Sequence, residues 1–462
     1  MVAYTSREAL MAGARPVANA FALANRMAGA YTGMFPLLRG YTNTFNANAT
    51  LLERSVAEYG KPDWNIDHTY VGKEKIDLPL NHTMIDGQKV LVSIKPVLEK
   101  PFGDLIHFER DPKSVAHRND PKVLVIGPMS GHYLTLLRGT FTEHLPHSDL
   151  YGTDWHNARD VPAGEPFDQD SQIAYIKEYL EFLGPNTHVI AVCQPCGPTM
   201  TAISQLAAEN SPNQPLSMTY VAGPVDTGAA PSEVSEFPFH PMFSPFVNAA
   251  TSTVPIQFEG AGRRVHMGQA QLFGFMLPKM QTHTEKQLKA WLNEALGNDE
   301  AAELSHRFYD EYLAVMDLPA EYIQQHCNRT FINRDLANGT LVVDGKLIDP
   351  SNIKKTAIYI VEGGKDDIST PGQTEAALEI CSGVPQHQRY YHLEPGVGHY
   401  GSFEGSGYRA GIAPRQASFI RKIGEEAGLH YSQMPTERTL IEPTRHQWAR
   451  QKQGLAPEAT AA

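Results

Sequence analysis

The chain has 462 residues, of which 42% are hydrophobic and 19% are charged, so it can form one large domain with insertions or two to three smaller ones. Its formal net charge of −12 argues against nucleic acid and against anionic membrane surfaces as partners. Four cysteines are too few for a disulfide framework, which favours a reducing compartment.

Residues 1–60 are predicted to form a helical extension, because Ala, Leu and Met recur at spacings of three to four residues. Their larger apolar side chains would form one face: Phe21, Leu23, Met27, Tyr31, Met34, Phe35 and Leu38. We favour a helix pair that packs on the rest of the domain, and a patch that docks on a hydrophobic surface is the alternative. We expect neither a signal peptide nor a membrane span, since no apolar run approaches ~18–20 residues.

Residues 61–223 are predicted to form the first part of a mostly parallel α/β core. An antiparallel opening is expected at 89–96 and 104–108. Short apolar runs, typical of strands, then follow at 122–127, 150–155, 189–192 and 217–222. The intervening segment 168–182 is predicted to be a helix with one apolar side: Ile173, Ile176, Tyr179, Leu180 and Leu183. Strands that alternate with helices indicate a parallel sheet with helices on its faces.

The alternation of strands and helices stops over residues 224–354, which are rich in Pro, Phe and Met early and helical at 284–315. This stretch is too long for an ordinary connection, so we predict a cap over the active site. The core resumes over 355–449. Its expected elements are strands at 356–362 and 389–393 and helices at 373–381 and 414–428. Residues 450–462 are predicted to be a disordered tail.

The strand at 189–192 leads into Cys193, a turn dense in Pro and Gly, and a predicted helix at 199–206. A strand, a sharp turn and a helix with a nucleophile at the corner indicate the nucleophile elbow of an α/β-hydrolase. The usual G-x-S-x-G is replaced here by the run from Ala191 to Pro195. Cysteine is a competent nucleophile because its thiolate is reactive. Gln194 would lend its backbone N–H to the oxyanion hole.

The pair Cys193-x-x-Cys196 leaves two other interpretations open. It is compatible with a redox dithiol, and also with two buried, inert cysteines. A zinc site is disfavoured, because the chain has no second C-x-x-C or C-x-x-H pair.

The partners of the nucleophile are predicted from chain order, which in this fold is nucleophile, acid, then histidine. Asp366 follows the strand that ends at Glu362, and we prefer it to Asp367 as the acid. His399 lies in a glycine-rich loop after the next strand and would be the base, oriented by the carboxylate. The second oxyanion donor is expected to be the Met129 amide, since Pro128 has no N–H.

Six segments of the chain carry a family resemblance. They begin at Gly127, Thr153, Val192, Gly260, Val361 and Pro395 and read GPMSGH, TDWHNARDVP, VCQPC, GAGRR, VEGGKDDI and PGVGHYG. Together they resemble the intracellular poly(3-hydroxybutyrate) depolymerases, over about residues 60–425.

The resemblance implies a hydrolase without cofactor or metal, which cleaves ester bonds of amorphous storage polyester in the bacterial cytoplasm, at the storage granule. It places a Cys-Asp-His triad on Cys193, Asp366 and His399. At two positions, Gly197 and Gly364, the sequence departs from the pattern of this family. These departures put the preferred polyester in doubt more than the chemistry.

Two alternatives of other kinds stay open. A polyester synthase uses the same triad for acyl transfer, and a catalytically silent granule-associated protein could keep the fold. The sequence leaves the oligomeric state undecided, and a homo-oligomer is compatible with it.

Overall fold

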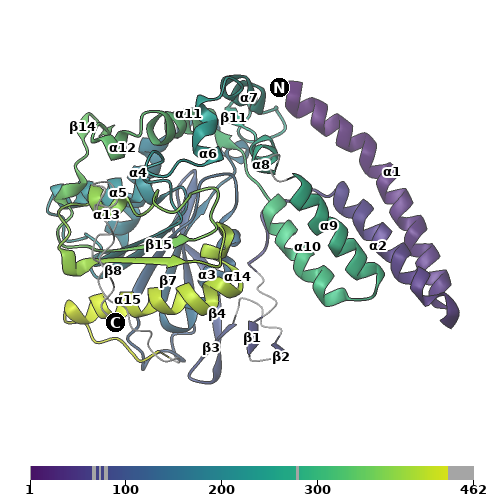
Figure 1. Cartoon of the computed structure of the whole chain (residues 1–462), viewed down its shortest axis with the longest axis horizontal. Coiled ribbons are helices and arrows are strands. Elements are labelled where there is room, and N and C mark those ends of the chain that lie inside the picture. The colour runs from purple at the N-terminus through teal and green to yellow at the C-terminus, as the bar shows by residue number, and fades with distance from the viewer. Residues whose placement is uncertain (1, 65–68, 72–73, 77–81, 277–279, 435–462) are drawn as a thin grey trace.

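A nine-stranded sheet forms the centre of the molecule (Figure 1). The computed structural model describes residues 2–434 except 65–68, 72–73, 77–81 and 277–279. The strand order is β16-β15-β9-β8-β6-β7-β5-β4-β3. Strands from β16 to β7 are parallel, and β5, β4 and β3 are antiparallel to their neighbours. The strands are β3 (His82–Ile85), β4 (Gln88–Leu98), β5 (Gly103–Arg110), β6 (Lys122–Ile126), β7 (Asp149–Trp155), β8 (Thr187–Val192), β9 (Ser217–Val221), β15 (Ala357–Gly363) and β16 (Arg389–Glu394).

The central strands are buried on both faces of the sheet. In β6, Leu124 and Ile126 join one hydrophobic cluster, while Val123 and Val125 join the other, as the two-residue period of a strand requires. The helices α4 (Gln169–Leu183) and α5 (Cys196–Ala208) pack on the first face, and α3 (Arg138–His144) and α15 (Ala413–Glu426) pack on the second. This mostly parallel, two-sided arrangement, with a strand–turn–helix at its centre, confirms the predicted α/β-hydrolase fold.

The expected helix at 168–182 is found as α4, and its five predicted apolar residues are all buried. Asp168 caps it, accepting a hydrogen bond from the Ser171 backbone N–H at 2.9 Å. The expected helix at 373–381 is wrong in extent, since only α13 (Ala377–Ile380) forms. The buried Glu362 carboxylate accepts the N–H groups of Gly372 and Thr374, which draws this segment into turns instead.

The residues between β9 and β15 add helices and small sheets beyond the central sheet. The helices are α6 (Glu233–Glu236), α7 (Phe243–Ala250), α8 (Gly268–Met276), α9 (Met280–Ala295), α10 (Asp299–Leu313), α11 (Ala320–His326) and α12 (Asp335–Asn338). The strands are β10 (Thr251–Thr253), β11 (Arg264–His266), β12 (Leu318–Pro319), β13 (Val342–Val343) and β14 (Lys346–Leu347). The helical stretch expected at 284–315 is divided because Gly297 adopts a positive φ of 76° and ends the first helix. The pair β1 (Thr69–Val71) and β2 (Glu74–Ile76) precedes the core.

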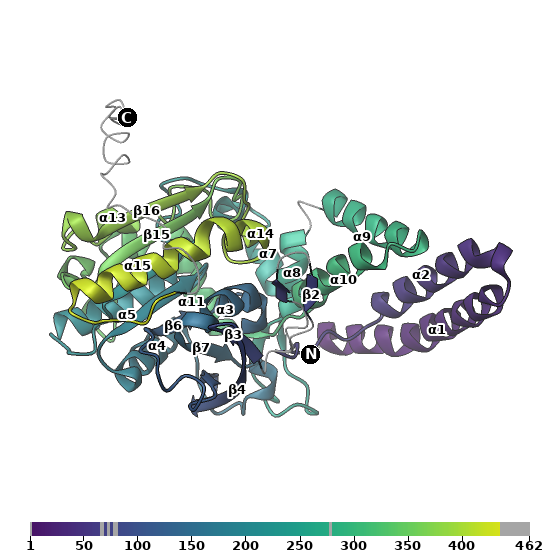
Figure 2. The ribbon, with the colours of Figure 1, turned by 90° about the horizontal axis from the view of Figure 1, so that it is seen from below.

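Two long helices, α1 (Val2–Gly33) and α2 (Arg39–Ser55), form an arm that projects from the α/β body (Figure 2). The arm is attached through α2, where Asn48 accepts a hydrogen bond from Trp291 of α9 at 3.0 Å and Arg54 pairs with Asp310 of α10 at 2.7 Å. The favoured expectation, a helix pair that packs on the rest of the domain, agrees with the contact of α2 with α9 and α10. Most of the apolar side chains expected to form its packing face are exposed instead. The small residues of α1, such as Ala22, face α2, so the large ones point outward.

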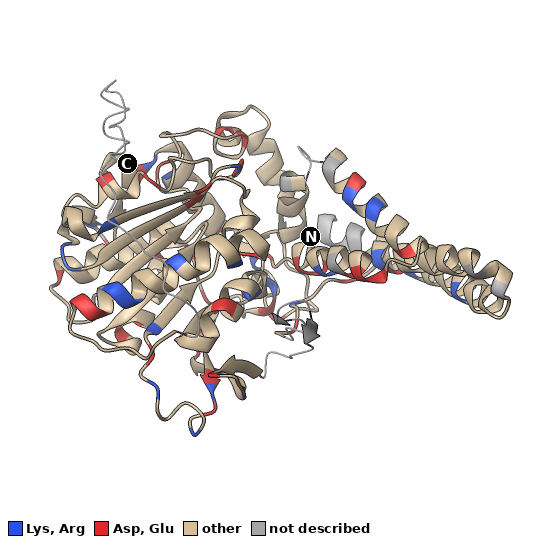
Figure 3. Cartoon of the chain, turned by 60° about the horizontal axis from the view of Figure 1, so that its bottom comes forward, with Lys and Arg blue, Asp and Glu red and all other residues tan. Residues whose placement is uncertain are grey.

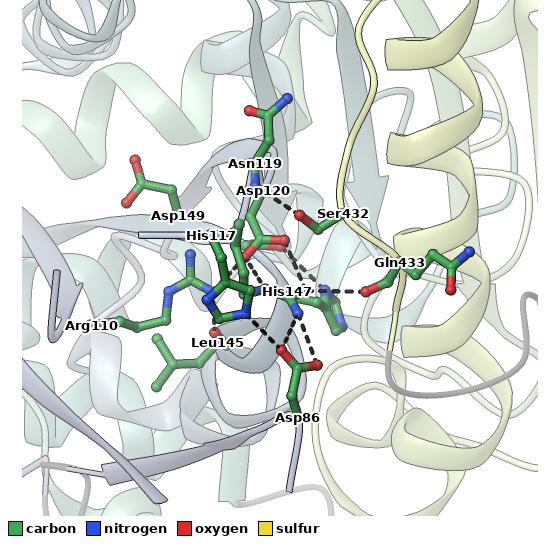
Figure 4. A network of polar contacts seen from close by, with 12 residues as sticks. Asp86, Arg110, His117, Asn119, Asp120, Leu145, His147, Asp149, Ser432 and Gln433 are labelled. Atoms are coloured by element: carbon green, nitrogen blue, oxygen red, sulfur yellow. Dashed lines mark hydrogen bonds and ion pairs between the residues drawn. The ribbon is translucent and has the colours of Figure 1, made fainter. Parts of the chain in front are cut away.

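A polar network fastens the last described residues to the sheet (Figure 4). The buried Asp120 carboxylate lies 2.8 Å from Arg110 and 2.9 Å from Arg118. Next to it, the Asn119 backbone N–H donates to the Ser432 hydroxyl at 2.7 Å. The predicted disordered tail, 450–462, lies outside the described residues. No described helix combines the length and hydrophobicity that a membrane crossing requires.

Burial lowers the pKa of several histidines, so acid should destabilise the fold. The pKa is about 3 for His188 and about 4 for His132, His144, His266 and His326. In the unfolded chain these groups bind protons below about pH 6.5, whereas in the folded chain they stay neutral. The stability that these histidines contribute is therefore complete above about pH 6.5. It falls toward pH 4, by up to about 1.4 kcal/mol per pH unit for each histidine.

Urea unfolding at a series of pH values checks this prediction. We expect the midpoint to fall between pH 6.5 and 5, before most carboxylates titrate. An unchanged midpoint over that interval would contradict it.

Candidate active site

The turn after β8 places Cys193 at the carboxyl end of the central strands. Cys193 adopts a φ of 64°, a conformation that costs a residue with a side chain about 1–3 kcal/mol. Its backbone N–H donates to Val221 of β9 at 2.8 Å, and its carbonyl accepts from the Cys196 N–H at 3.2 Å. The side chain is partly exposed, whereas the strand before it is wholly buried. This is the strained, outward-facing geometry of a nucleophile elbow.

The elbow is closely packed from behind by Gly223, directly beyond β9. A Cβ at position 223 would lie 2.3 Å from the Cys196 sulfur and 2.8 Å from the Cys193 carbonyl oxygen, so only glycine fits. The Thr374 hydroxyl bonds both the N–H and the C=O of Gly223, at 2.9 and 3.0 Å. The backbone N–H of Thr374 donates in turn to the Glu362 carboxylate at 2.8 Å. The elbow is thus tied to the end of β15.

Asp366 and His399 meet beside the elbow as a buried pair, 4% and 6% exposed. The Asp366 Oδ2 atom lies 2.8 Å from His399 Nδ1. Its Oδ1 atom accepts the backbone N–H groups of Ile368 and Ser369, both at 2.9 Å. Of the two adjacent aspartates considered as the acid, it is therefore Asp366 that contacts the imidazole.

The charges around His399 favour its protonated form. Burial alone would lower the pKa of the imidazole, but the Asp366 carboxylate and the Cys193 side chain, each by charge and by hydrogen bonding, raise the pKa well above its usual value. This arrangement fits a thiolate–imidazolium pair in which the carboxylate holds the ring from the other side.

The expected oxyanion donors lie in a buried amide network. The Met129 N–H donates to the side-chain oxygen of Gln194 at 3.1 Å. The Gln194 side chain also exchanges two hydrogen bonds with Gln172, at 3.0 and 3.1 Å. Tyr322 of α11 donates to Gln172 at 3.1 Å. The Met129 amide therefore has an internal acceptor here, and its oxyanion role stays a prediction.

Cys196, the second cysteine of the motif, is fully buried at the start of α5. Its thiol donates to the Ala191 carbonyl at 3.4 Å, and burial raises its pKa well above the usual value. Such a thiol is poorly suited to redox exchange, which requires an accessible thiolate. Within the ranges that the structure covers, no three His, Cys, Asp or Glu side chains are grouped to hold a metal ion.

Aromatic residues from the insertion contact the catalytic loop, and sequence reasoning missed them. Tyr312 of α10 packs on Tyr400, the residue after His399, with ring centroids 5.7 Å apart. His132 also contacts Tyr312, since its Nε2 atom lies 3.2 Å from the Tyr312 carbonyl oxygen. No local motif marks Tyr312, although Tyr400 directly follows the predicted base. In the part of the insertion that is rich in Phe and Pro, Phe243 and Phe246 both pack on Phe237, with ring centroids 5.6 Å apart.

Comparison with known proteins adds a family likeness. Residues 222–424 match the family described as "PHB de-polymerase C-terminus". This part of the chain is similar to PHB depolymerases. The matched segment contains Asp366, His399 and the insertion, but it begins after Cys193. No curated protein matches the chain in sequence.

Several solved structures resemble this chain weakly, at low sequence identity. A putative lipase from Acinetobacter baumannii AYE has a TM-score of 0.40 at 10% identity, covering 72% of this chain and 93% of that one. A putative aryl esterase from Burkholderia cenocepacia has a TM-score of 0.40 at 11% identity, covering 72% of this chain and 100% of that one. A monoacylglycerol lipase from Paleococcus ferrophilus has a TM-score of 0.37 at 11% identity, covering 66% of this chain and 97% of that one. At this distance the fold assignment rests on the strand order of this chain itself.

The expected likeness to PHB depolymerases is therefore confirmed for residues 222–424, and the α/β-hydrolase fold is confirmed. The intracellular subtype, the cysteine nucleophile and the amorphous substrate stay predictions. The departure at Gly364 has a local cause, because a Cβ there would lie 2.8 Å from Pro395 Cα. At Gly197 a Cβ would meet only Leu336, at 3.7 Å.

Gly364 should be needed for activity, since it lets the loop that carries His399 approach β15. We expect Gly364→Ala to displace that loop and to lower kcat/KM by about 10- to 100-fold, because small misplacements of catalytic groups cost rate steeply. Hydrolysis of a short soluble ester measures the effect. Gly396→Ala in the same loop is the matched control, since a Cβ there meets nothing within 4 Å. Equal losses in both variants would contradict the prediction.

Proposed function

We propose that this protein hydrolyses ester bonds of amorphous poly(3-hydroxybutyrate), with Cys193 as nucleophile, His399 as base and Asp366 as orienting acid. The observation that carries the proposal is the buried Asp366–His399 pair, joined at 2.8 Å and interacting with a cysteine at a strained elbow. The match of residues 222–424 to PHB depolymerases supports the substrate class. The bacterial cytoplasm, at the storage granule, is the location that the resemblance implies.

In the acylation step, the proton of Cys193 is already on His399 Nε2, and the Cys193 sulfur attacks the ester carbonyl. The carbonyl oxygen becomes an oxyanion, for which the backbone N–H of Gln194 is an expected donor. The Met129 N–H joins it once the substrate oxygen replaces the Gln194 side-chain oxygen as its acceptor. The tetrahedral intermediate collapses, the C–O bond breaks, and His399 gives its proton to the departing hydroxyl.

In the deacylation step, His399 removes a proton from water, and the hydroxide attacks the thioester carbonyl. Collapse releases a 3-hydroxybutyrate oligomer or monomer as the acid and restores the thiolate–imidazolium pair. Asp366 keeps Nδ1 of the ring protonated throughout, so that Nε2 carries out both transfers. The buried Tyr312 packs on Tyr400 and supports the loop that carries His399.

Acid release from amorphous poly(3-hydroxybutyrate) granules tests the proposal. We expect Cys193→Ala to lower the rate by at least about 1,000-fold, because the acyl-enzyme can no longer form. Cys196→Ala is the matched control: its thiol is buried and bonded to the backbone, so activity should stay within a few-fold.

Each alternative predicts a different result. No acid release by the wild type, with CoA release from hydroxybutyryl-CoA, would favour a polyester synthase. Granule binding that survives Cys193→Ala, without hydrolysis by the parent protein, would favour a silent granule protein. Equal loss of activity in both cysteine variants would favour a paired dithiol.

A further inference from the structure

The helix α1 has an apolar face on the side turned away from α2. Its exposed large residues include Leu10, Val17, Met27 and Tyr31, which are 56–72% exposed, and Met34, directly after the helix, is 76% exposed. The opposite face, with the buried Ala22, already packs on α2. A surface helix normally presents charged and polar residues to water, and a helix that is apolar all round is normally buried. The outer face of α1 therefore lacks a partner within the described chain.

The outer face follows a heptad repeat. Eight exposed residues recur at alternating spacings of three and four, and all are apolar: Leu10, Gly13, Val17, Ala20, Ala24, Met27, Tyr31 and Met34. We call this set the α1 seam. A period of 3.5 residues is the pattern of a helix that packs along another helix, and a flat surface requires no such register. The seam therefore fits a helical partner.

The charges of α1 keep clear of the seam. Arg15 pairs with Glu58 at 2.8 Å, and Arg26 pairs with Glu53 of α2 at 2.8 Å. Residues 1–60 contain five Arg and three Glu, so the negative excess of the chain lies entirely in the rest of the molecule. In Figure 3 most of the arm has the tan colour of residues other than Lys, Arg, Asp and Glu. Two copies can thus bring their arms together without bringing like charges into contact.

We propose that the α1 seam pairs with the seam of a second copy of this chain, in antiparallel orientation about an axis near residue 22. The pairing is self-complementary, as a two-fold interface requires. Leu10 then faces Met34 and Val17 faces Met27. Tyr31, the largest seam residue, faces Gly13, the smallest. At the axis Ala20 faces Ala24, where small side chains let two helices approach closely.

The shape of the molecule supports the antiparallel orientation. The amino-terminal end of α1 lies beside the α/β body, and the turn between α1 and α2 is the distant tip (Figure 2). An antiparallel pair therefore places the two acidic bodies at opposite ends, whereas a parallel pair would crowd them together. Two such hairpins, joined through α1, give a four-helix arrangement.

The size of the seam predicts moderate affinity. It spans 25 residues, about 37 Å at 1.5 Å per residue, and a helix is about 10 Å wide. The pair then buries on the order of 800 Å², at or below the low end of specific interfaces. We therefore expect a dimer that dissociates on dilution. This inference does not depend on the proposed function.

Sedimentation velocity of the full chain from about 1 to about 100 μM tests the proposal. We expect the wild type to shift from monomer to dimer across this range. Val17→Glu/Met27→Glu places like charges opposite each other in the antiparallel register, so association should weaken by about 100-fold or more. Val17→Glu/Met27→Lys places opposite charges there and should restore much of the association. Ala12→Glu/Asn19→Glu, exposed on the same helix but outside the seam, should dimerise like the wild type.

Circular dichroism and hydrolysis of a short soluble ester verify that each variant is folded and competent. A wild type that stays monomeric throughout, or a Val17→Glu/Met27→Glu variant that still dimerises, overturns the proposal. So does equal weakening in the Glu/Glu and Glu/Lys variants, because it removes the antiparallel register. If the wild type is monomeric and only the seam variants lose binding to polyester granules, the seam docks on polymer instead.

Discussion

The sharp bend at Cys193 is the constraint on which the rest of the site depends. A residue with a side chain is held at a φ of 64° there, and such strain persists only where the surroundings enforce it. The enforcement is visible in the backbone bond to Val221 and in the close approach of Gly223. The side chain that this bend presents interacts with His399.

Two buried carboxylates at the end of β15 divide the work of holding this bend and its partner. Glu362 accepts the N–H groups of Gly372, Thr374 and Glu375, together with the Tyr391 hydroxyl. It thereby fixes the segment that braces Gly223. Asp366 bonds two N–H groups of its own loop and reserves its other oxygen for His399. Both carboxyl groups are tolerated in the interior because hydrogen bonds replace the lost water.

The insertion between β9 and β15 links the catalytic centre to the arm. Its Tyr312 contacts His132 in the loop after β6 and Tyr400 in the loop after β16, and its α9 and α10 support α2. The arm therefore contacts an insertion that also packs against the loop that carries His399. The family match covers this insertion together with the acid and the histidine, so the case for the nucleophile comes from the geometry of Cys193 itself.

The sequence by itself determined the features that local pattern controls. The buried strands, the helix after Asp168 and the order of Cys193, Asp366 and His399 all follow from short-range hydrophobic periods and from chain order. The tertiary structure decided whatever depends on contacts between distant segments. Glu362 accepts hydrogen bonds from the segment after residue 371 and so replaces the expected helix by turns, and the Gln194 side chain accepts the Met129 N–H. The residues in each of these pairs are far apart in the sequence, so no local spacing reveals them. The direction in which α1 points its large side chains was likewise decided by α2, because two faces of one helix compete and the partner that packs most closely selects between them.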